Sequence, residues 1–214
     1  MKPRPATLCE MDANCIQDVA KVDASFLVDS RLRLHAEDGQ VGFSVIGVAP
    51  FRKRYPQDSI DYAAYLNSPG RVIYLAYADG QVAGLIRLRT NWNRYAYVED
   101  IAVDVRFRRR GIGRMLLSRA IEWARGRGLP GVMLETQDNN VAACKLYQSV
   151  GFQLGGFDRL LYRGLQADTQ EVALYWYLVF PAEGTQAPSK GSHASVEPRG
   201  QQPSAPSSGA LRRP

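Results

Sequence analysis

The sequence predicts a mixed α/β (α+β) fold in which helices pack on one sheet, and three observations predict it. The 214 residues are 45% hydrophobic and 22% charged, the balance of a folded globular chain rather than a disordered one. Two β-rich runs are separated by Asp79-Gly80, a strong hairpin signal. Further along, strand-like runs alternate with two helical patterns, so the order is strands first and then helix, strand, helix, strand.

The expected strands are short runs rich in aliphatic and aromatic residues: 72–78, 81–88, 95–103, 132–136 and 172–180. The first 70 residues give weaker signals. There we expect helices over residues 10–26 and 59–66 and a strand over residues 42–48.

Two helices are expected in the second half of the chain. Gly111 opens the first, whose apolar residues at 112, 116, 117, 120, 121 and 124 have amphipathic spacing, and Gly126, Gly128 and Pro130 end it. The second covers residues 140–150 and closes at Gly151.

Residues 1–180 are expected to form one domain, since ordinary domains have this size. Residues 181–214 hold 6 Pro, 6 Ser and 4 Gly and little that could be buried, so they are expected to be a disordered tail. No apolar run approaches the ~18 residues of a membrane span, and the start lacks the apolar stretch of a signal peptide. These features predict a cytoplasmic protein without a membrane partner.

The chain has few cysteines and histidines for a disulfide framework, a metal site or a catalytic triad. Cys9, Cys15 and Cys144 contain no C-x-x-C pair, and His35 is the only histidine before the tail. A disulfide framework, a zinc site and a Ser-His-Asp triad are therefore disfavoured. We expect reduced thiols and no metal.

The positive charge is concentrated at one point. The tail carries four basic and two acidic residues, which leaves +4 of the net charge of +6 on the first 180 residues. The densest stretch is Arg106 and Arg108 to Arg110, followed by Gly111 and Gly113 at a predicted strand-to-helix junction. Unpaired N–H groups of a first helical turn, close-approaching glycines and arginine side chains suit a pyrophosphate. The alternative is a tight turn beside a solvated basic patch.

Three carboxylates lie within otherwise apolar strands. Glu99 and Asp100 are adjacent in the strand before the basic run, so their side chains are expected on opposite faces, and Glu135 lies in the next strand. A carboxylate in such a place carries a desolvation cost that is tolerated beside a cation or at a proton-transfer site. The alternative for each is a solvated strand face or an ion pair with an arginine.

The second predicted helix carries Asn140, Cys144 and Tyr147 on one stripe, at i, i+4 and i+7. A phenol with a pKa near 10 can protonate a departing thiolate with a pKa near 8.5, so Tyr147 is a candidate general acid. The alternative is a tyrosine packed in the core. Cys144 has no histidine to activate it, and we interpret it as a small buried residue.

Together these patterns resemble the GCN5-related N-acetyltransferase (GNAT) family. The acetyl-CoA signature of that family, Gln/Arg-x-x-Gly-x-Gly/Ala between a strand and a helix, corresponds to Arg108-Arg109-Arg110-Gly111-Ile112-Gly113. Its downstream helix pattern corresponds to Asn140 and Leu146-Tyr147-Gln148-Ser149-Val150-Gly151-Phe152. The resemblance implies the family's fold, a mixed and mostly antiparallel sheet splayed between two strands.

Residues 85–180 are similar, more narrowly, to the streptothricin (nourseothricin) acetyltransferases. The similarity lies in Asn91-Trp92-Asn93 and in residues 97–104, 134–140, 143–147 and 173–177, whereas residues 1–70 and the tail match no motif. Those enzymes inactivate a polycationic antibiotic by acetylating an amine of its β-lysine moiety. The resemblance implies the same N-acetyltransferase reaction, by direct transfer from acetyl-CoA.

The resemblance also implies where the cosubstrate lies. The pantetheine arm would pair with the strand at residues 101–103, the pyrophosphate with N–H groups of residues 109–114, and the 3′-phosphate with the arginine run. The implied cofactor residues are Ile101, Ala102, Val103, Arg108, Arg109, Arg110, Gly111, Ile112, Gly113, Arg114, Asn140 and Tyr147.

An alkyl ammonium with a pKa near 10.4 must lose a proton before it attacks, so a base is needed, directly or through a water. The resemblance implies Glu135 as that base. Glu99 or Asp100 are alternatives, or they hold other cationic groups of the acceptor. Tyr147 would protonate the thiolate, and a main-chain N–H near Val103 would stabilise the oxyanion. Trp92 and Tyr97 are expected to line the acceptor pocket.

Three other interpretations stay open at this point. An enzyme of the same fold would acetylate a protein N-terminus, a lysine or another small polyamine. A nucleic-acid-binding module would use the run Arg106 to Arg110, although +4 on the domain is thin support. A non-catalytic acyl-CoA sensor would bind the cosubstrate without releasing thiol. The oligomeric state is also open, a homodimer being one alternative.

Overall fold

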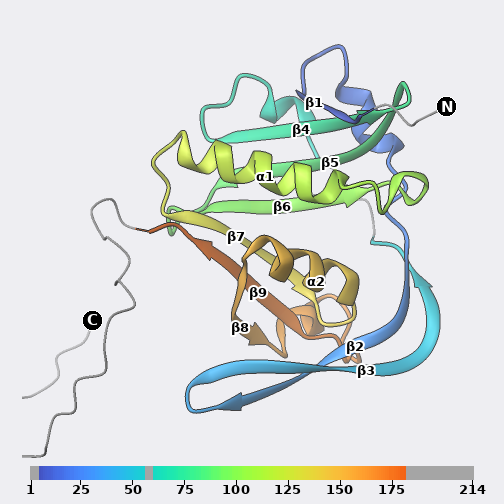
Figure 1. The fold of residues 1–214 in the computed structure, drawn as a ribbon, viewed down its shortest axis with the longest axis vertical. Helices are drawn as coiled ribbons and strands as arrows, with labels where there is room; N and C mark the ends of the chain where they lie inside the picture. Colours follow the sequence, from blue (N-terminus) through green and yellow to red (C-terminus); the bar gives the residue numbers. More distant parts are fainter. Residues whose placement is uncertain (1–4, 56–59, 182–214) are drawn as a thin grey trace, which may run out of the picture. The chain divides into compact units, whose positions relative to one another are not determined.

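A seven-stranded sheet positions the rest of the protein in the computed structural model, which describes residues 5–55 and 60–181. The strands follow the order β1, β4, β5, β6, β7, β9, β8 across the sheet (Figure 1). Their bounds are β1 Thr7–Glu10, β4 Arg71–Ala78, β5 Gln81–Thr90, β6 Ala96–Val103, β7 Gly131–Gln137, β8 Gln153–Asp158 and β9 Ala173–Val179. All neighbouring pairs are antiparallel except β6 and β7, which are parallel. The predicted mixed, mostly antiparallel sheet is confirmed.

Two helices, α1 (Ile112–Arg125) and α2 (Val141–Val150), pack on one face of this sheet (Figure 1). The apolar spacing expected for α1 is confirmed, because its buried residues are Ile112, Leu116, Leu117, Ala120, Trp123 and Ala124. They share one core with Val98, Leu134 and Trp176 of the sheet. Each large aliphatic side chain buried there contributes about 1.5–3 kcal/mol, so this face anchors both helices to the strands that precede them.

The opposite face of β4, β5 and β6 is covered by short 3₁₀ helices rather than by long ones. These are η1 (Ile16–Lys21) and η2 (Tyr62–Tyr65). Val19, Val22 and Tyr65 pack with Ile73, Leu75, Leu85 and Ala102 in a second, smaller core. This thinner cover ends near β7.

A long hairpin, β2 (Phe26–Glu37) and β3 (Gln40–Lys53), forms a separate two-stranded sheet. Its turn is Asp38-Gly39, with φ of 49° and 73°, the conformation that two-residue hairpin turns require. Leu32 N donates to Asp138 O at 2.8 Å, and the Arg31 guanidinium contacts the Asp138 carboxylate at 2.5 Å. The hairpin is thereby attached to the end of β7, and the chain leaving β3 passes that end.

Two expectations for the elements need correction. Residues 10–26 are not a helix: they contain the end of β1, a turn, η1 and the start of β2. The Asp12 carboxylate accepts from the N–H groups of Asn14 and Cys15 at 2.8 and 3.1 Å, and such local bonds compete with helix formation. The expected helix over 59–66 is only η2, with residue 59 outside the described part. The expected strand over 42–48 is confirmed as part of β3, while β1, β2 and β8 were not predicted.

Among the described residues, no helix is both long and apolar enough to cross a bilayer. The predicted tail from residue 182 onward lies outside the described residues.

A buried aspartate fixes the turn that leads from β6 into α1. Asp104 is 1% exposed and accepts hydrogen bonds from the backbone N–H groups of Asp23 at 3.0 Å and Arg106 at 2.9 Å. The Arg106 guanidinium contacts it at 2.8 Å. The Arg106 hydrogen bond, outweighing the opposing effect of burial, lowers the pKa of Asp104 to about 2. The ionised form therefore stabilises the fold.

We expect Asp104→Asn to lower the free energy of unfolding at pH 7 by about 1–2 kcal/mol, because the charge-assisted bonds are lost. A pKa below the ordinary 3.8 means that this contribution is present above about pH 4 and is lost as the pH falls toward 2. Denaturant unfolding at pH 7 and pH 3 measures it. Asp79→Asn, at the more exposed ion pair with Arg110, should change stability by less than about 0.5 kcal/mol. Equal losses of unfolding free energy in Asp104→Asn and Asp79→Asn would contradict the stabilising role of ionised Asp104. So would an effect of Asp104→Asn that is the same at pH 7 and pH 3.

Candidate active site

β6 and β7 separate after a short parallel ladder. They pair only from Ala96 opposite Val132 to Val98 opposite Leu134, although β6 continues to Val103 and β7 to Gln137. Beyond Val98, β6 keeps its pairing with β5 on the other side, through Val103 opposite Gly84. Within the part of the chain that the structure describes, the stretch 99–103 thus has one edge without a strand partner, which leaves main-chain groups available to a ligand.

A β-bulge lies where the two strands begin to separate. Asp100 pairs with Arg87 and Val98 with Leu88, so Glu99 is an extra residue in β6. An extra residue bends the strand and resets the alternation of its side chains. Glu99 and Asp100 therefore both face the side of the second core, where both line one cavity. The expectation that they point to opposite faces is wrong because it assumed an unbroken strand.

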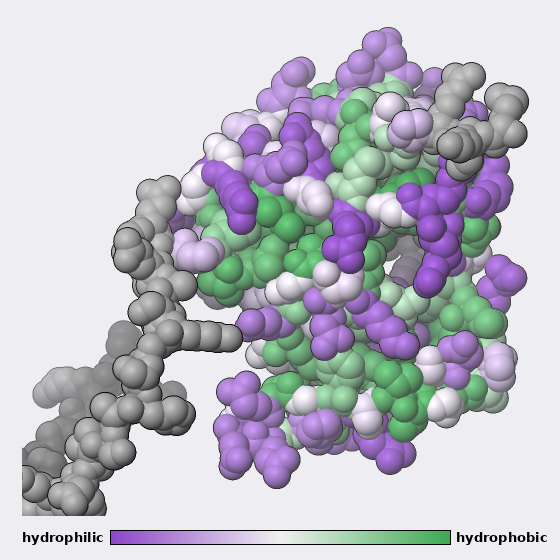
Figure 2. Space-filling model, in the orientation of Figure 1, coloured by the Kyte–Doolittle hydropathy of each residue, from purple (hydrophilic) through white to green (hydrophobic). Residues whose placement is uncertain are grey.

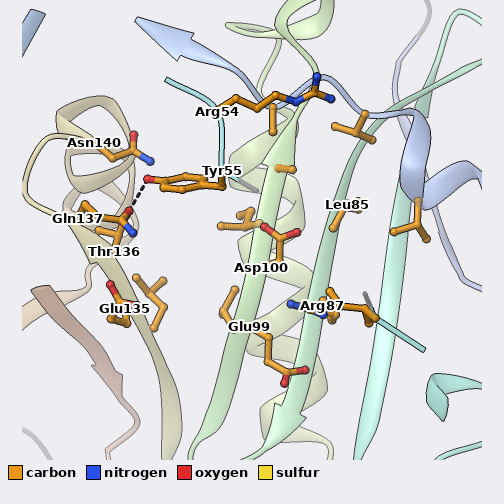
Figure 3. A pocket seen from close by; sticks show the side chains of 18 of the residues that line it. Arg54, Tyr55, Leu85, Arg87, Glu99, Asp100, Glu135, Thr136, Gln137 and Asn140 are labelled. Carbon is orange, nitrogen blue, oxygen red and sulfur yellow. Dashed lines mark hydrogen bonds between the residues drawn. The ribbon is translucent and has the colours of Figure 1, made fainter. Parts of the chain in front are cut away.

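The cavity between the separated strands has a volume of about 340 Å³. Figure 2 shows a hollow on this face between the part that carries α1 and the β2–β3 hairpin. Figure 3 shows side chains from β5, β6, β7 and the start of α2 around the cavity, together with Arg54 and Tyr55 from the segment after β3. Its polar lining consists of Arg54, Tyr55, Tyr62, Arg87, Glu99, Asp100, Glu135, Thr136, Gln137, Asn140 and Tyr147.

The structure thus brings together four residues that the sequence marked separately: Glu99, Asp100, Glu135 and Tyr147. Glu99 accepts from the Tyr65 hydroxyl at 2.6 Å and from Nε of Arg89 at 3.1 Å, so its charge is partly balanced. Glu135 accepts from the Tyr162 hydroxyl. Its pKa is raised, chiefly by burial, against the opposing effects of Tyr162 and Lys53. A raised carboxyl pKa favours proton acceptance near neutral pH.

Tyr147 extends from α2 into the same cavity and is only 4% exposed. Burial raises its pKa well above the ordinary value, and nearby Cys144, Tyr55 and Asp100 add to this. The phenol therefore stays protonated at neutral pH and can donate. Cys144 is 1% exposed, and burial raises the pKa of its thiol to about 12, which confirms the interpretation as a small buried residue.

Tyr55 is a lining residue that sequence reasoning missed. Its ring lies across the space beside β7, and its hydroxyl donates to Oε1 of Gln137 (Figure 3). Asn140 is the N-cap of α2, where its side chain accepts from Ala143 N at 3.4 Å. No motif marks Tyr55, because it follows a hairpin whose position depends on long-range contacts. Tyr62 and Arg87 also line the cavity and were not predicted, because no local sequence signal marks them.

The glycine-rich turn before α1 has the geometry of an anion-binding turn. Gly111, the N-cap residue, has φ of 82°, and Arg109 has φ of 63°, both in the left-handed region. No side chain caps α1, so the N–H groups of its first turn stay available. A Cβ on Gly113 would lie 2.9 Å from Leu146, which shows how closely α1 and α2 approach there.

The arginine run is largely engaged within the protein. Arg106 pairs with Asp104, Arg110 pairs with Asp79 at 2.8 Å, and Arg108 donates to the carbonyls of Val103 and Ala24 at 3.1 Å. Arg114 donates to Ser149. Within the described residues no partner is recorded for the Arg109 guanidinium. The run therefore offers fewer cationic side chains to a nucleic acid or a 3′-phosphate than the sequence implied.

Neither Trp92 nor Tyr97 is among the described residues that line the cavity. Trp92 is 89% exposed in the turn between β5 and β6. Tyr97 lies in the paired part of β6, opposite Met133, with the Arg89 guanidinium 4.8 Å from its ring centre. Their role at the acceptor stays a prediction, which was based on the attraction of an aromatic face for an ammonium.

Residues 34–152 match the model of the acetyltransferase (GNAT) family, and the chain belongs to this family. Members are acetyl-CoA-dependent acyltransferases, and this protein is an N-acetyltransferase. The chain is 36% identical to streptothricin acetyltransferase A of Bacillus subtilis (strain 168), over 77% of this chain and 95% of the relative. It is 34% identical to streptothricin acetyltransferase of Escherichia coli, over 76% of this chain and 90% of that relative.

A solved structure from Bacillus anthracis str. Ames, described as a streptothricin acetyltransferase in complex with acetyl coenzyme A, has the same fold. The TM-score is 0.76 at 42% identity, and the alignment covers 82% of this chain and 98% of that one. The residues present here fit such a cosubstrate. The open edge at residues 99–103 offers main-chain groups to an amide-bearing arm, and the left-handed turn at Gly111 offers N–H groups to a phosphate. Within the described residues, no three His, Cys, Asp or Glu side chains are arranged so that they could hold a metal ion.

Gly111→Ala should weaken acetyl-CoA binding by about fivefold, because a Cβ at φ of 82° costs about 1 kcal/mol and shifts the N–H groups of the turn. Gly128→Ala is the matched control. Gly128 also has a positive φ, 63°, and open space for a Cβ, but it lies beyond the other end of α1. Calorimetric titration with acetyl-CoA measures the affinity of both variants. Equal affinities in the two variants would contradict the role of this turn.

Proposed function

We propose that this protein inactivates streptothricin-class antibiotics by transferring the acetyl group of acetyl-CoA directly to an amine of their β-lysine moiety. The observation that carries the proposal is the convergence of Glu99, Asp100 and Glu135 with Tyr147 on one cavity between the separated strands. Such a cavity suits an acceptor that carries several ammonium groups. The names of the relatives given above support the same acceptor.

In the proposed reaction the carboxylates have two tasks. Glu135, whose pKa is raised by burial, accepts a proton from the acceptor ammonium, directly or through a water. Glu99 and Asp100, on the facing strand, hold the other ammonium groups and so orient the acceptor. We keep Glu99 or Asp100 as the alternative base.

The cosubstrate side uses main-chain groups and one phenol. Bound acetyl-CoA supplies an activated acetyl group as a thioester. Ile101, Ala102 and Val103 hold the pantetheine arm along the open edge of β6, and a main-chain N–H near Val103 stabilises the oxyanion. The N–H groups of residues 109–114, including Ile112, Gly113 and Arg114, hold the pyrophosphate, and Arg109 is the best-placed arginine for the 3′-phosphate. Asn140 contacts the arm, and Tyr147 donates its phenolic proton to the departing sulfur.

The proposed partners are therefore a small polycationic acceptor and acetyl-CoA, with neither a nucleic acid nor a membrane. Since the proposed reaction uses a cosubstrate held inside cells, we place it in the cytoplasm. The direct test is release of free thiol from acetyl-CoA with and without streptothricin, followed by mass spectrometry of the product. Thiol release that requires streptothricin, with one added acetyl group, is expected. Acetylation of peptides alone would overturn the proposed acceptor.

Glu135→Gln should lower kcat by about 10²-fold or more, because the amide cannot accept the proton. Asp100→Asn should mainly raise KM for streptothricin, because one acceptor contact loses its charge. Acetyl-CoA affinity should stay within about twofold in both. Glu122→Gln, at an exposed ion pair on α1, is the control and should keep full activity. Full activity in both cavity variants would remove the acidic residues from the mechanism.

Tyr147→Phe should lower kcat by about 10²-fold while the fold and acetyl-CoA affinity persist, because only the proton donor is removed. Steady-state kinetics, with circular dichroism to check the fold, measure this. A kcat within twofold of the unmodified protein would exclude Tyr147 as the general acid.

A further inference from the structure

A tyrosine that no sequence motif marks contacts the carboxylate proposed as the base. The hydroxyl of Tyr162 donates a hydrogen bond to Oε1 of Glu135. Tyr162 is partly buried and belongs to η4 (Leu161–Gly164), whereas Glu135 belongs to β7. The contact joins two segments that the motifs of the family do not connect.

The backbone around Tyr162 holds it in place. Asp158, the last residue of β8, accepts from Leu160 N at 2.7 Å and Leu161 N at 3.1 Å, which starts the 3₁₀ turn. Leu165 N donates to Tyr162 O at 3.0 Å and closes it. Because β8 pairs with β9 and β9 pairs with β7, a turn fixed at the end of β8 can reach across to Glu135.

The surroundings of Glu135 make this hydrogen bond important. Burial opposes the ionised carboxylate, and Tyr162 and Lys53 are the groups that favour it. Lys53, at the end of β3, is itself paired with Glu171. Other titratable groups near Glu135 include Tyr55 after β3, Tyr97 of β6, Tyr147 of α2 and Tyr175 of β9. The charged residues that line the same cavity are Arg54, Arg87, Glu99 and Asp100. The tyrosines are neutral near pH 7, and Asp100 adds no favourable charge.

We propose that Tyr162 is a positioning residue for the base, holding Glu135 by one oxygen so that the other faces the acceptor ammonium in ionised form. The proposal rests on the proposed function. A carboxylate has several acceptor positions, so a bond at Oε1 leaves Oε2 for the substrate proton. In the step itself, a proton passes from the ammonium to Glu135, and the freed amine attacks the thioester carbonyl to form the C–N bond. The C–S bond then breaks, Tyr147 protonates the departing sulfur, the second amine proton returns to the Tyr147 phenolate directly or through a water, and Tyr162 keeps its own proton.

The test is Tyr162→Phe, which removes the hydroxyl and keeps the ring. The acid limb of the kcat/KM profile for streptothricin should move up by about one pH unit, because the ionised carboxylate loses a donor. The Glu135 carboxyl pKa, followed by ¹³C NMR titration and assigned with Glu135→Gln, should rise by the same amount. Tyr175→Phe is the matched control. Tyr175 pairs with Glu135 in the β7–β9 ladder, but within the described residues its hydroxyl gives no hydrogen bond to that carboxylate, so neither readout should move.

The two readouts separate the ways in which the proposal can fail. An unchanged carboxyl pKa in folded Tyr162→Phe overturns the positioning role. A raised carboxyl pKa with an unchanged acid limb overturns Glu135 as the base, and with it the role of Tyr162 in turnover. Absence of streptothricin-dependent thiol release in the unmodified protein is a different result, because it overturns the proposed acceptor whatever the NMR titration shows.

Discussion

The separation of β6 from β7 is the constraint on which the rest of the site depends. Parallel pairing stops after Val98, and the bulge at Glu99 lies at that point. A strand edge that runs on without a partner leaves polar main-chain groups that must find water or a ligand. The same bulge turns two adjacent carboxylates toward one cavity. The open edge proposed for the cosubstrate and the acidic side of the cavity thus begin at the same irregularity of β6.

This arrangement concentrates negative charge, and the fold offsets the cost with specific partners. Glu99 is held by Tyr65 and Arg89, and Glu135 is held by Tyr162 with Lys53 nearby. Both carboxylates therefore keep hydrogen-bond donors despite partial burial, and at Glu135 the Tyr162 bond opposes the effect of burial on the pKa. Arg54 and Arg87 line the same cavity, so three carboxylates face two arginines, and the cationic acceptor of the proposed function would meet a small excess of negative charge without rearrangement of the acids.

Local signals were sufficient for the central elements but not for the first 70 residues. Asp79-Gly80 and the apolar spacing of α1 depend on neighbouring residues, and both expectations are confirmed. Asp38-Gly39 is the same kind of turn signal, but no hairpin was predicted there. Charged residues interrupt the alternation of apolar and polar residues along β2, so the run does not read as a strand. Glu135 and Tyr147, which were predicted to be catalytic, both line the cavity, and their roles stay predictions. The bulge at Glu99 left no readable pattern, since it depends on the register with β5.

The groups around the proposed base come partly from the segments that sequence patterns describe least. Tyr55, which lines the cavity, and Lys53 come from the end of the β2–β3 hairpin, and Tyr162 comes from a single 3₁₀ turn. The hairpin is placed by contacts between segments distant in the chain, the Arg31–Asp138 and Lys53–Glu171 pairs, and Tyr162 by its hydrogen bond to Glu135. The cosubstrate side, by contrast, needs only a local turn and a strand edge. In the proposed function the choice of amine therefore depends on the hairpin and the η4 turn, whereas the proposed cosubstrate contacts do not.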